Sequence, residues 1–108
     1  MTVKQLIQRC GLTAAALPEE DREVTGVYIG DLLSWVMGRA QSGDAWITIM
    51  SNQNIVAVAT LADTACVILA EEVQPDEGVA ALAQQKGINL LCSPYSAYDT
   101  ALRLRDAL

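Results

Sequence analysis

The longest apolar stretch of the chain, residues 46–72, overlaps two runs that predict buried strands. Residues 45–50 are rich in aromatic and β-branched side chains, and residues 65–70 form an unbroken apolar run. Strands that are apolar on both faces are typical of a parallel sheet covered by helices on both sides. A polar break at residues 51–54 separates the two runs.

The segment between these strands, residues 52–62, is ambiguous by pattern alone. Val56 and Val58 favour a strand, whereas Ile55, Val56 and Ala59 fall at helical spacing. A helix also supplies the crossover that two parallel neighbours need. We therefore predict a helix here.

The rest of the pattern alternates between helical and extended periods. It predicts helices at residues 3–10, 32–40, 75–86 and 93–107, and strands at residues 12–17, 23–29 and 88–92. Pro75 suits the first turn of one helix, and Ser93 followed by Pro94 suits the start of the last. The expected fold is a single domain over residues 1–108, a three-layer α/β/α arrangement around a mostly parallel sheet of about five strands.

Composition and charge argue against several classes of function. The formal charge of −6 and the scattered basic residues oppose nucleic-acid binding, which needs clustered Lys and Arg. No apolar run reaches about 18 residues, so we predict no membrane span, and the polar start of the chain argues for a cytoplasmic protein. The chain has no His, the commonest general base and metal ligand, so we expect no catalytic residues, no metal and no cofactor.

Three cysteines, Cys10, Cys66 and Cys92, are odd in number and far apart in the chain. Cys66 and Cys92 lie in predicted strands, where a free thiol serves as a small buried side chain. Redox or metal roles are the alternative.

Four turns follow the predicted parallel strands, and the carboxyl ends of such strands are where ligands bind in open α/β sheets. The candidate ligand-binding residues in these turns are Gly30, Asp31, Ser51, Asn52, Gln53, Glu71, Glu72, Ser93 and Tyr95. The same residue types are ordinary caps and turn formers, so a purely structural role is the alternative. Asp31, Glu71 and Glu72 would make a pocket here acidic, favouring a cation or an amine over a bare phosphate.

Trp35 lies off the apolar stripe of its predicted helix, close to Arg39. A Trp beside an Arg is typical of an interface anchor, although partial burial within the monomer is the alternative. The chain is short and apolar, with a mean hydropathy of +0.26. We therefore expect self-association, most simply as a two-fold homodimer.

Residues 81–88 read ALAQQKGI and residues 93–101 read SPYSAYDTA. These strings resemble the DRTGG domain family, and VTGVYIGDLLSWVMGRA at residues 24–40 is similar to the family's first strand and helix. The likeness runs from about residue 3 to residue 104. The motif that gives the family its name is not retained. Its Asp-Arg falls on Asn52 and Gln53, and its Thr-Gly-Gly falls on residues 70–72, Ala-Glu-Glu.

The resemblance implies a regulatory or protein-interaction module without chemistry of its own. Relatives accompany CBS domains in regulated pyrophosphatases, where they pair, or precede phosphotransacetylase domains. The family also resembles the amino-terminal domain of HPr kinase, but this chain has no Gly-Lys dipeptide and hence no phosphate-binding loop of the kinase type. The stand-alone branch implies an association with iron-only hydrogenase components and a partner enzyme. The alternative function is sensing of an adenine nucleotide or another small ligand.

Overall fold

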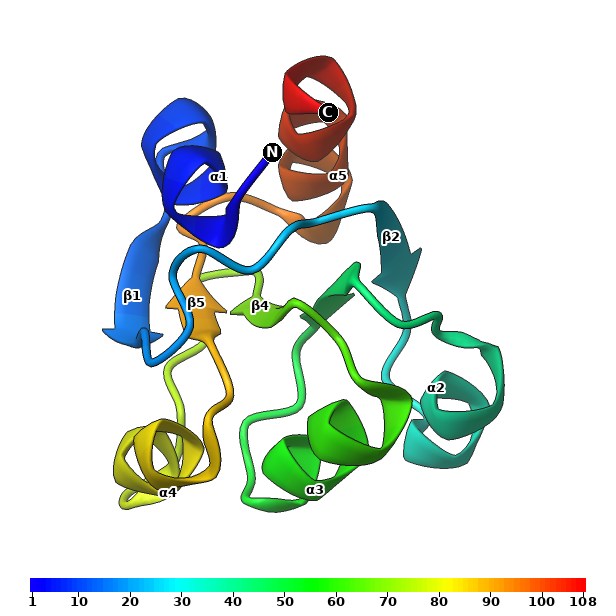
Figure 1. The fold of residues 1–108 in the computed structure, drawn as a ribbon, viewed down its shortest axis with the longest axis vertical. Coiled ribbons are helices and arrows are strands. Elements are labelled where there is room, and N and C mark those ends of the chain that lie inside the picture. Colours follow the sequence, from blue (N-terminus) through cyan, green and yellow to red (C-terminus); the bar gives the residue numbers. More distant parts are fainter.

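One five-stranded sheet separates two layers of helices in the computed structural model, which describes residues 1–108 (Figure 1). Helices α1 and α5 cover one face of the sheet, and α2, α3 and α4 cover the other. In chain order the elements are α1 (Val3–Cys10), β1 (Thr13–Ala16), β2 (Gly26–Ile29), α2 (Leu33–Arg39), β3 (Asp44–Thr48), α3 (Asn54–Ala62), β4 (Cys66–Leu69), α4 (Val79–Lys86), β5 (Leu90–Cys92) and α5 (Ala97–Ala107). The predicted three-layer α/β fold and the predicted order of elements are confirmed.

The strands lie in the order β1-β5-β4-β3-β2. Strands β2, β3, β4 and β5 are parallel, while β1 runs antiparallel to β5. The three predicted buried strands are therefore neighbours at the centre of the sheet. Strands β1 and β2 form its two open edges, which leaves the backbone of each unpaired on one side.

The core is divided by the sheet into two apolar clusters. Ile47, Ile68 and Leu91 point to the side of α1 and α5, and Trp46 and Val67 point to the other side. All five are fully buried. Successive side chains of a strand face opposite ways, so unbroken apolar runs are needed to fill both clusters.

The predicted crossover helix is confirmed as α3. It buries Ile55, Val56, Val58 and Ala59 against the sheet and ends at Asp63, which has a left-handed backbone (φ 57°). The need to connect two parallel strands outweighed the strand propensity of the two valines.

The predicted start of α4 at Pro75 was wrong, because the helix begins at Val79. Asp76 instead joins the turn after β3. Its carboxylate accepts a hydrogen bond of 2.8 Å from Ser51 Oγ, and its N–H donates to the Ser51 carbonyl at 3.0 Å. Gly78, with φ 85°, makes the turn into the helix.

The predicted cap of α5 was also wrong. Ser96, not Ser93, caps the helix by accepting a hydrogen bond of 3.0 Å from the Asp99 N–H, and α5 begins at Ala97. Ser93 points inward and shares a buried hydrogen bond of 2.7 Å with Thr100 Oγ1.

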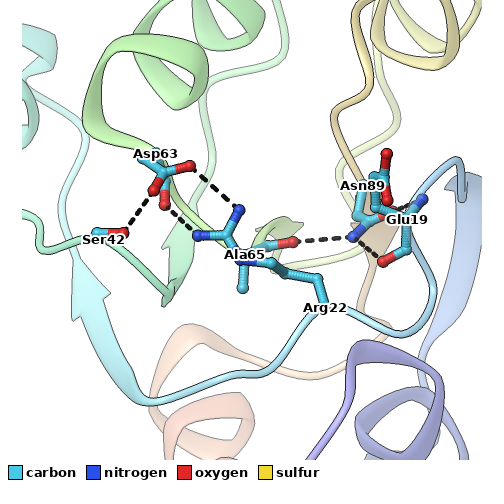
Figure 2. A network of polar contacts seen from close by, with 6 residues as sticks. All are labelled: Glu19, Arg22, Ser42, Asp63, Ala65 and Asn89. Carbon is cyan, nitrogen blue, oxygen red and sulfur yellow. Dashed lines mark hydrogen bonds and ion pairs between the residues drawn. The ribbon is translucent and has the colours of Figure 1, made fainter.

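A polar network joins the amino ends of the central strands to the loop before β2 (Figure 2). The Asn89 side chain accepts from the Glu19 N–H at 2.9 Å and donates to the carbonyls of Glu19 and Ala65 at 2.8 and 2.9 Å. It thereby satisfies backbone groups that no strand reaches. The network lies at the end of the sheet opposite to the ligand-binding edge of such folds.

Asp63 is the second centre of this network (Figure 2). Its carboxylate accepts hydrogen bonds from Ser42 Oγ and from Arg22 Nη1, the latter at 3.1 Å, and its carbonyl accepts from Arg22 Nη2 at 2.9 Å. These hydrogen bonds, followed by the charge of Arg22, hold the pKa of Asp63 below its ordinary value of 3.8. The charged form is thus favoured in the folded protein.

We expect Asp63→Asn to make the protein less stable at neutral pH, with a deficit that shrinks in acid. Asn tolerates the left-handed backbone, so the variant removes the charge and one of the two oxygens that accept from Arg22 and Ser42 without adding backbone strain. A carboxyl whose pKa is lowered by folding contributes stability above its unfolded pKa. It loses that contribution as the pH falls from 3.8 through the lower folded value. Urea unfolding across a pH series checks this. A deficit independent of pH would mean that the carboxylate charge is not the cause.

Candidate functional site

Four parallel strands end at one edge of the sheet, and the turns that follow them carry all nine predicted ligand-binding residues. The first turn contains Gly30 and Asp31. Asp31 Oδ1 accepts hydrogen bonds from Thr48 Oγ1 at 2.8 Å and from the Ile49 N–H at 3.0 Å. The Gly30 carbonyl accepts from the buried Trp46 Nε1 at 2.8 Å. This turn is therefore fastened to β3 by its own polar groups.

The second turn contains Ser51, Asn52 and Gln53. Ser51 binds Asp76, and Asn52 Oδ1 accepts a hydrogen bond of 2.9 Å from the Asn54 N–H at the start of α3. Gln53 lies at one end of a groove of about 520 Å³ between α3 and α4, which Leu82 also lines. Gln53 is thus the one residue of this turn that borders a groove.

The third and fourth turns are in contact with each other. The Glu71 N–H donates to the Tyr95 carbonyl at 2.8 Å, and the Glu72 N–H donates to the Ser93 carbonyl at 3.1 Å. Both glutamates have a left-handed backbone, with φ of 62° and 63°. This conformation costs a non-glycine residue roughly 1–2 kcal/mol. The two backbone contacts hold the strained pair in place.

The Glu71 carboxylate occupies the amino end of α5. Its Oε2 accepts a hydrogen bond of 2.7 Å from the N–H of Ala97, the first residue of the helix. A helix amino terminus attracts anions because its free N–H groups and dipole carry partial positive charge. In this chain that position is filled by an internal carboxylate.

We expect Glu71→Ala to destabilise the fold by about 0.5–1 kcal/mol, because α5 loses this exposed cap. Glu72→Ala is the matched control. It keeps the same backbone strain, and no hydrogen bond from the Glu72 side chain is present, so the change should stay within about 0.5 kcal/mol. Glu72→Gly should stabilise by roughly 0.5–1 kcal/mol through relief of strain. Chemical denaturation of the three variants checks the order. Equal losses for Glu71→Ala and Glu72→Ala would contradict the capping role.

Tyr95 is covered on one face by Arg103, whose guanidinium carbon lies 3.6 Å from the ring centre. A Cβ atom at Gly11 would lie 3.1 Å from the Tyr95 hydroxyl, so the left-handed Gly11 also lets this ring approach α1. The Tyr95 side chain therefore packs within the domain. It is not a free stacking platform.

Next to Tyr95 is a hollow of about 400 Å³ between β1 and the third and fourth turns. Of the predicted ligand-binding residues, Glu72 and Ser93 line this hollow, together with residues that were not predicted to bind a ligand. The lining residues are Gly11, Thr13, Glu72, Gln74, Cys92, Ser93 and Pro94. The pairing of β1 with β5 brings Thr13 here, and no local signal predicts that pairing.

All three cysteines are free and buried, as predicted for Cys66 and Cys92. Burial raises the pKa of Cys66 to about 12, with a smaller contribution from the neighbouring Cys10. Burial likewise raises the pKa of Cys10 and Cys92. The thiols are accordingly protonated and unreactive near neutral pH. No group of three or more His, Cys, Asp or Glu residues is placed to hold a metal ion.

Most of the exposed large apolar side chains belong to the edge strand β2 or to the helices α2 and α5. Trp35 on α2 is 53% exposed, and the guanidinium carbon of Arg39 lies 3.9 Å from its ring centre. The exposed large apolar residues are Val27, Ile29, Leu32, Trp35, Met37, Ile49, Leu61, Tyr98 and Leu108. All except Leu61 and Ile49 lie on β2, α2 or α5 or immediately next to one of them, and Ile49 directly follows β3.

The family model of the DRTGG domain matches residues 11–107, so the chain belongs to the DRTGG domain family. The predicted family membership is confirmed. No curated protein matches the chain. None of the five helices has both the length and the apolar character required to span a bilayer.

A solved structure shares the fold. It is the crystal structure of the CBS and DRTGG domains of the regulatory region of Clostridium perfringens pyrophosphatase, complexed with its activator diadenosine tetraphosphate. The TM-score is 0.77 at 12% sequence identity, and the match covers 99% of this chain and 47% of that chain. This chain thus spans about half the length of that regulatory region.

Proposed function

We propose that this DRTGG domain is a non-catalytic regulatory module that works through protein contacts, as a homodimer that docks on a partner enzyme. The observation that carries the proposal is a division of the surface. Polar groups at the carboxyl edge of the sheet bind one another, while large apolar side chains stay exposed around β2, α2 and α5. Exposed apolar patches mark interaction surfaces in proteins.

The carboxyl edge is poorly suited to phosphate. The Glu71 carboxylate fills the helix terminus that would attract an anion, and Asp31 and Glu72 add negative charge. Asn52 and Gln53 stand where the resemblance places the family's Asp-Arg, so the cation of that pair is missing. These features favour a protein ligand over a nucleotide.

The support for a role without catalysis is chemical. The chain lacks His, its thiols are buried, and the Asp31 carboxylate already accepts two hydrogen bonds. None of these groups is prepared to act as a nucleophile or a general base. The domain would then act on the activity of another protein.

The partner that we would test first comes from the resemblance. Stand-alone members of the family are associated with iron-only hydrogenase components, so an enzyme of that redox metabolism is the proposed partner. Trp35 stacked with Arg39 is the proposed anchor of the homodimer itself, because Trp and Arg are enriched at the centres of interfaces.

A second candidate function is sensing of an adenine nucleotide. It is favoured by the structural neighbour, whose regulatory region is complexed with diadenosine tetraphosphate. In this chain, the hollow lined by Thr13, Glu72 and Ser93 is the concave site next to the contacting turns.

Thermal unfolding with ATP and with diadenosine tetraphosphate separates the two functions. A ligand present at 100 times its dissociation constant adds about 2.7 kcal/mol of stability, which raises Tm by several degrees in a domain of this size. We expect no change in Tm with either nucleotide up to about 1 mM. A rise that depends on concentration would replace the interaction module by the nucleotide sensor.

A further inference from the structure

Strand β2 presents an unpaired backbone edge to solvent. It is the last strand of the sheet and is paired on one side only, with β3. The Gly30 N–H donates to the Ile47 carbonyl at 3.2 Å and so points toward β3. Successive backbone groups of a strand point to opposite sides, so the N–H and C=O groups of Val27 and Ile29 point outward. These groups can form a ladder with a further strand.

The side chains at this edge form an apolar groove. Val27 and Ile29 point toward α5, and Ile29 is 51% exposed. Together with Tyr98, Leu102 and Leu108 of the α5 segment they line a groove of about 540 Å³. Tyr98 is 72% exposed, so its ring projects into solvent at the rim of the groove.

The groove is also low in charge, although the chain as a whole carries a charge of −6. Arg105 is the one charged residue in its lining, and its guanidinium pairs with Asp106 at 3.1 Å. Two acidic molecules repel each other over most of their surfaces. No acidic residue lines this groove, so the repulsion between two copies is weaker there.

We infer that β2 pairs antiparallel with β2 of a second copy of the chain, about a two-fold axis, to form one sheet of ten strands from two sheets of five. The groove beside α5 is closed by the same contact. This inference rests on the homodimer of the proposed function and identifies the surface that forms it.

A second copy fits this edge better than an isolated strand of another protein. Under a two-fold axis the outward groups of one β2 meet the same groups of the other, so a single sequence satisfies both sides. A standard interface buries about 800 Å² on each partner, which is roughly one seventh of the 5492 Å² surface of this chain.

The first test compares two lysine variants by sedimentation over a range of concentrations. Ile29→Lys places a charge in the groove, whereas Leu61→Lys places the same charge on α3, at an apolar side chain that is 74% exposed. We expect Ile29→Lys to weaken dimerisation at least about 100-fold and Leu61→Lys to leave it unchanged. Circular dichroism checks that both variants fold.

The second test uses the native protein alone, so it does not depend on the folding of a variant. Amide hydrogen exchange is measured at high and low protein concentration. We expect the Val27 and Ile29 amides to be protected in the concentrated sample and to exchange rapidly in the dilute one.

The outcomes separate the surface from the dimer. Suppose that the native protein is a dimer. If Ile29→Lys leaves its mass unchanged, or if the Val27 and Ile29 amides stay unprotected, this surface is wrong and the dimer stands. A native monomer overturns the surface and the homodimer together, while docking on a partner enzyme remains to be judged by its own measurement.

Discussion

Replacing Ile68 with Ala is expected to lower the free energy of unfolding by about 2–5 kcal/mol. Ile68 lies in β4, the central strand of the sheet, and its side chain is fully buried against α1 and α5. Truncation removes buried apolar surface and leaves a cavity that neighbours such as Ile47 and Leu91 fill only in part, because they are fixed in adjacent strands. Urea unfolding followed by circular dichroism measures the loss.

The matched control is Leu61→Ala on α3, where the side chain is exposed. Its effect should stay within about 0.5 kcal/mol, because little apolar surface is returned to water. A loss below about 1 kcal/mol for Ile68→Ala would show that β4 is not at the centre of the core.

Replacing Trp35 with Asp is expected to shift the protein from dimer toward monomer by at least about tenfold in the dissociation constant. Trp35 belongs to α2, which directly follows the edge strand β2, and it offers a large exposed ring stacked on Arg39. The variant removes that apolar contact and places a carboxylate where the partner would exclude water. Sedimentation equilibrium gives both dissociation constants.

Met37→Asp is the control for this variant, since it adds the same charge to the same exposed helix. Residues two positions apart on a helix are rotated by about 200° about the helix axis, so Met37 and Trp35 point to opposite flanks of α2. We expect Met37→Asp to leave the dimer intact. If both variants dissociate it, the added charge matters and the position does not.

Much of the fold could be predicted because it follows from local pattern. The apolar runs of β3, β4 and β5 need an apolar layer on each face of the sheet. A parallel pair of strands needs a crossover connection, and this requirement decided the ambiguous residues 52–62 in favour of α3. Gly11 and Gly87 ended their helices with a left-handed backbone, as glycine does without steric cost.

The predicted starts of α4 and α5 were wrong because, in both places, a residue distant in the chain determines the local structure. Pro75 did not begin α4, because Ser51, far along the chain, binds Asp76 and draws the loop toward β3. Ser93 did not cap α5, because Thr100 takes its hydroxyl into the core. Neither partner can be identified from the residues next to Pro75 or Ser93.

At the candidate site, too, the features set by local pattern could be predicted and those set by distant contacts could not. The four turns could be placed at one edge of the sheet, because that edge follows from parallel strands. The bond from Glu71 to α5 could not be predicted, since it depends on the left-handed turn after β4 and on where α5 begins. The sequence predicted an acidic pocket at this edge, and that one contact shows that the Glu71 carboxylate binds the amino end of α5.

The mass of the native protein in solution tests the central claim most directly. Light scattering at a concentration of about 100 μM is predicted to give the mass of two chains, twice 11.6 kDa or 23.2 kDa. A mass of 11.6 kDa at that concentration would contradict the homodimer.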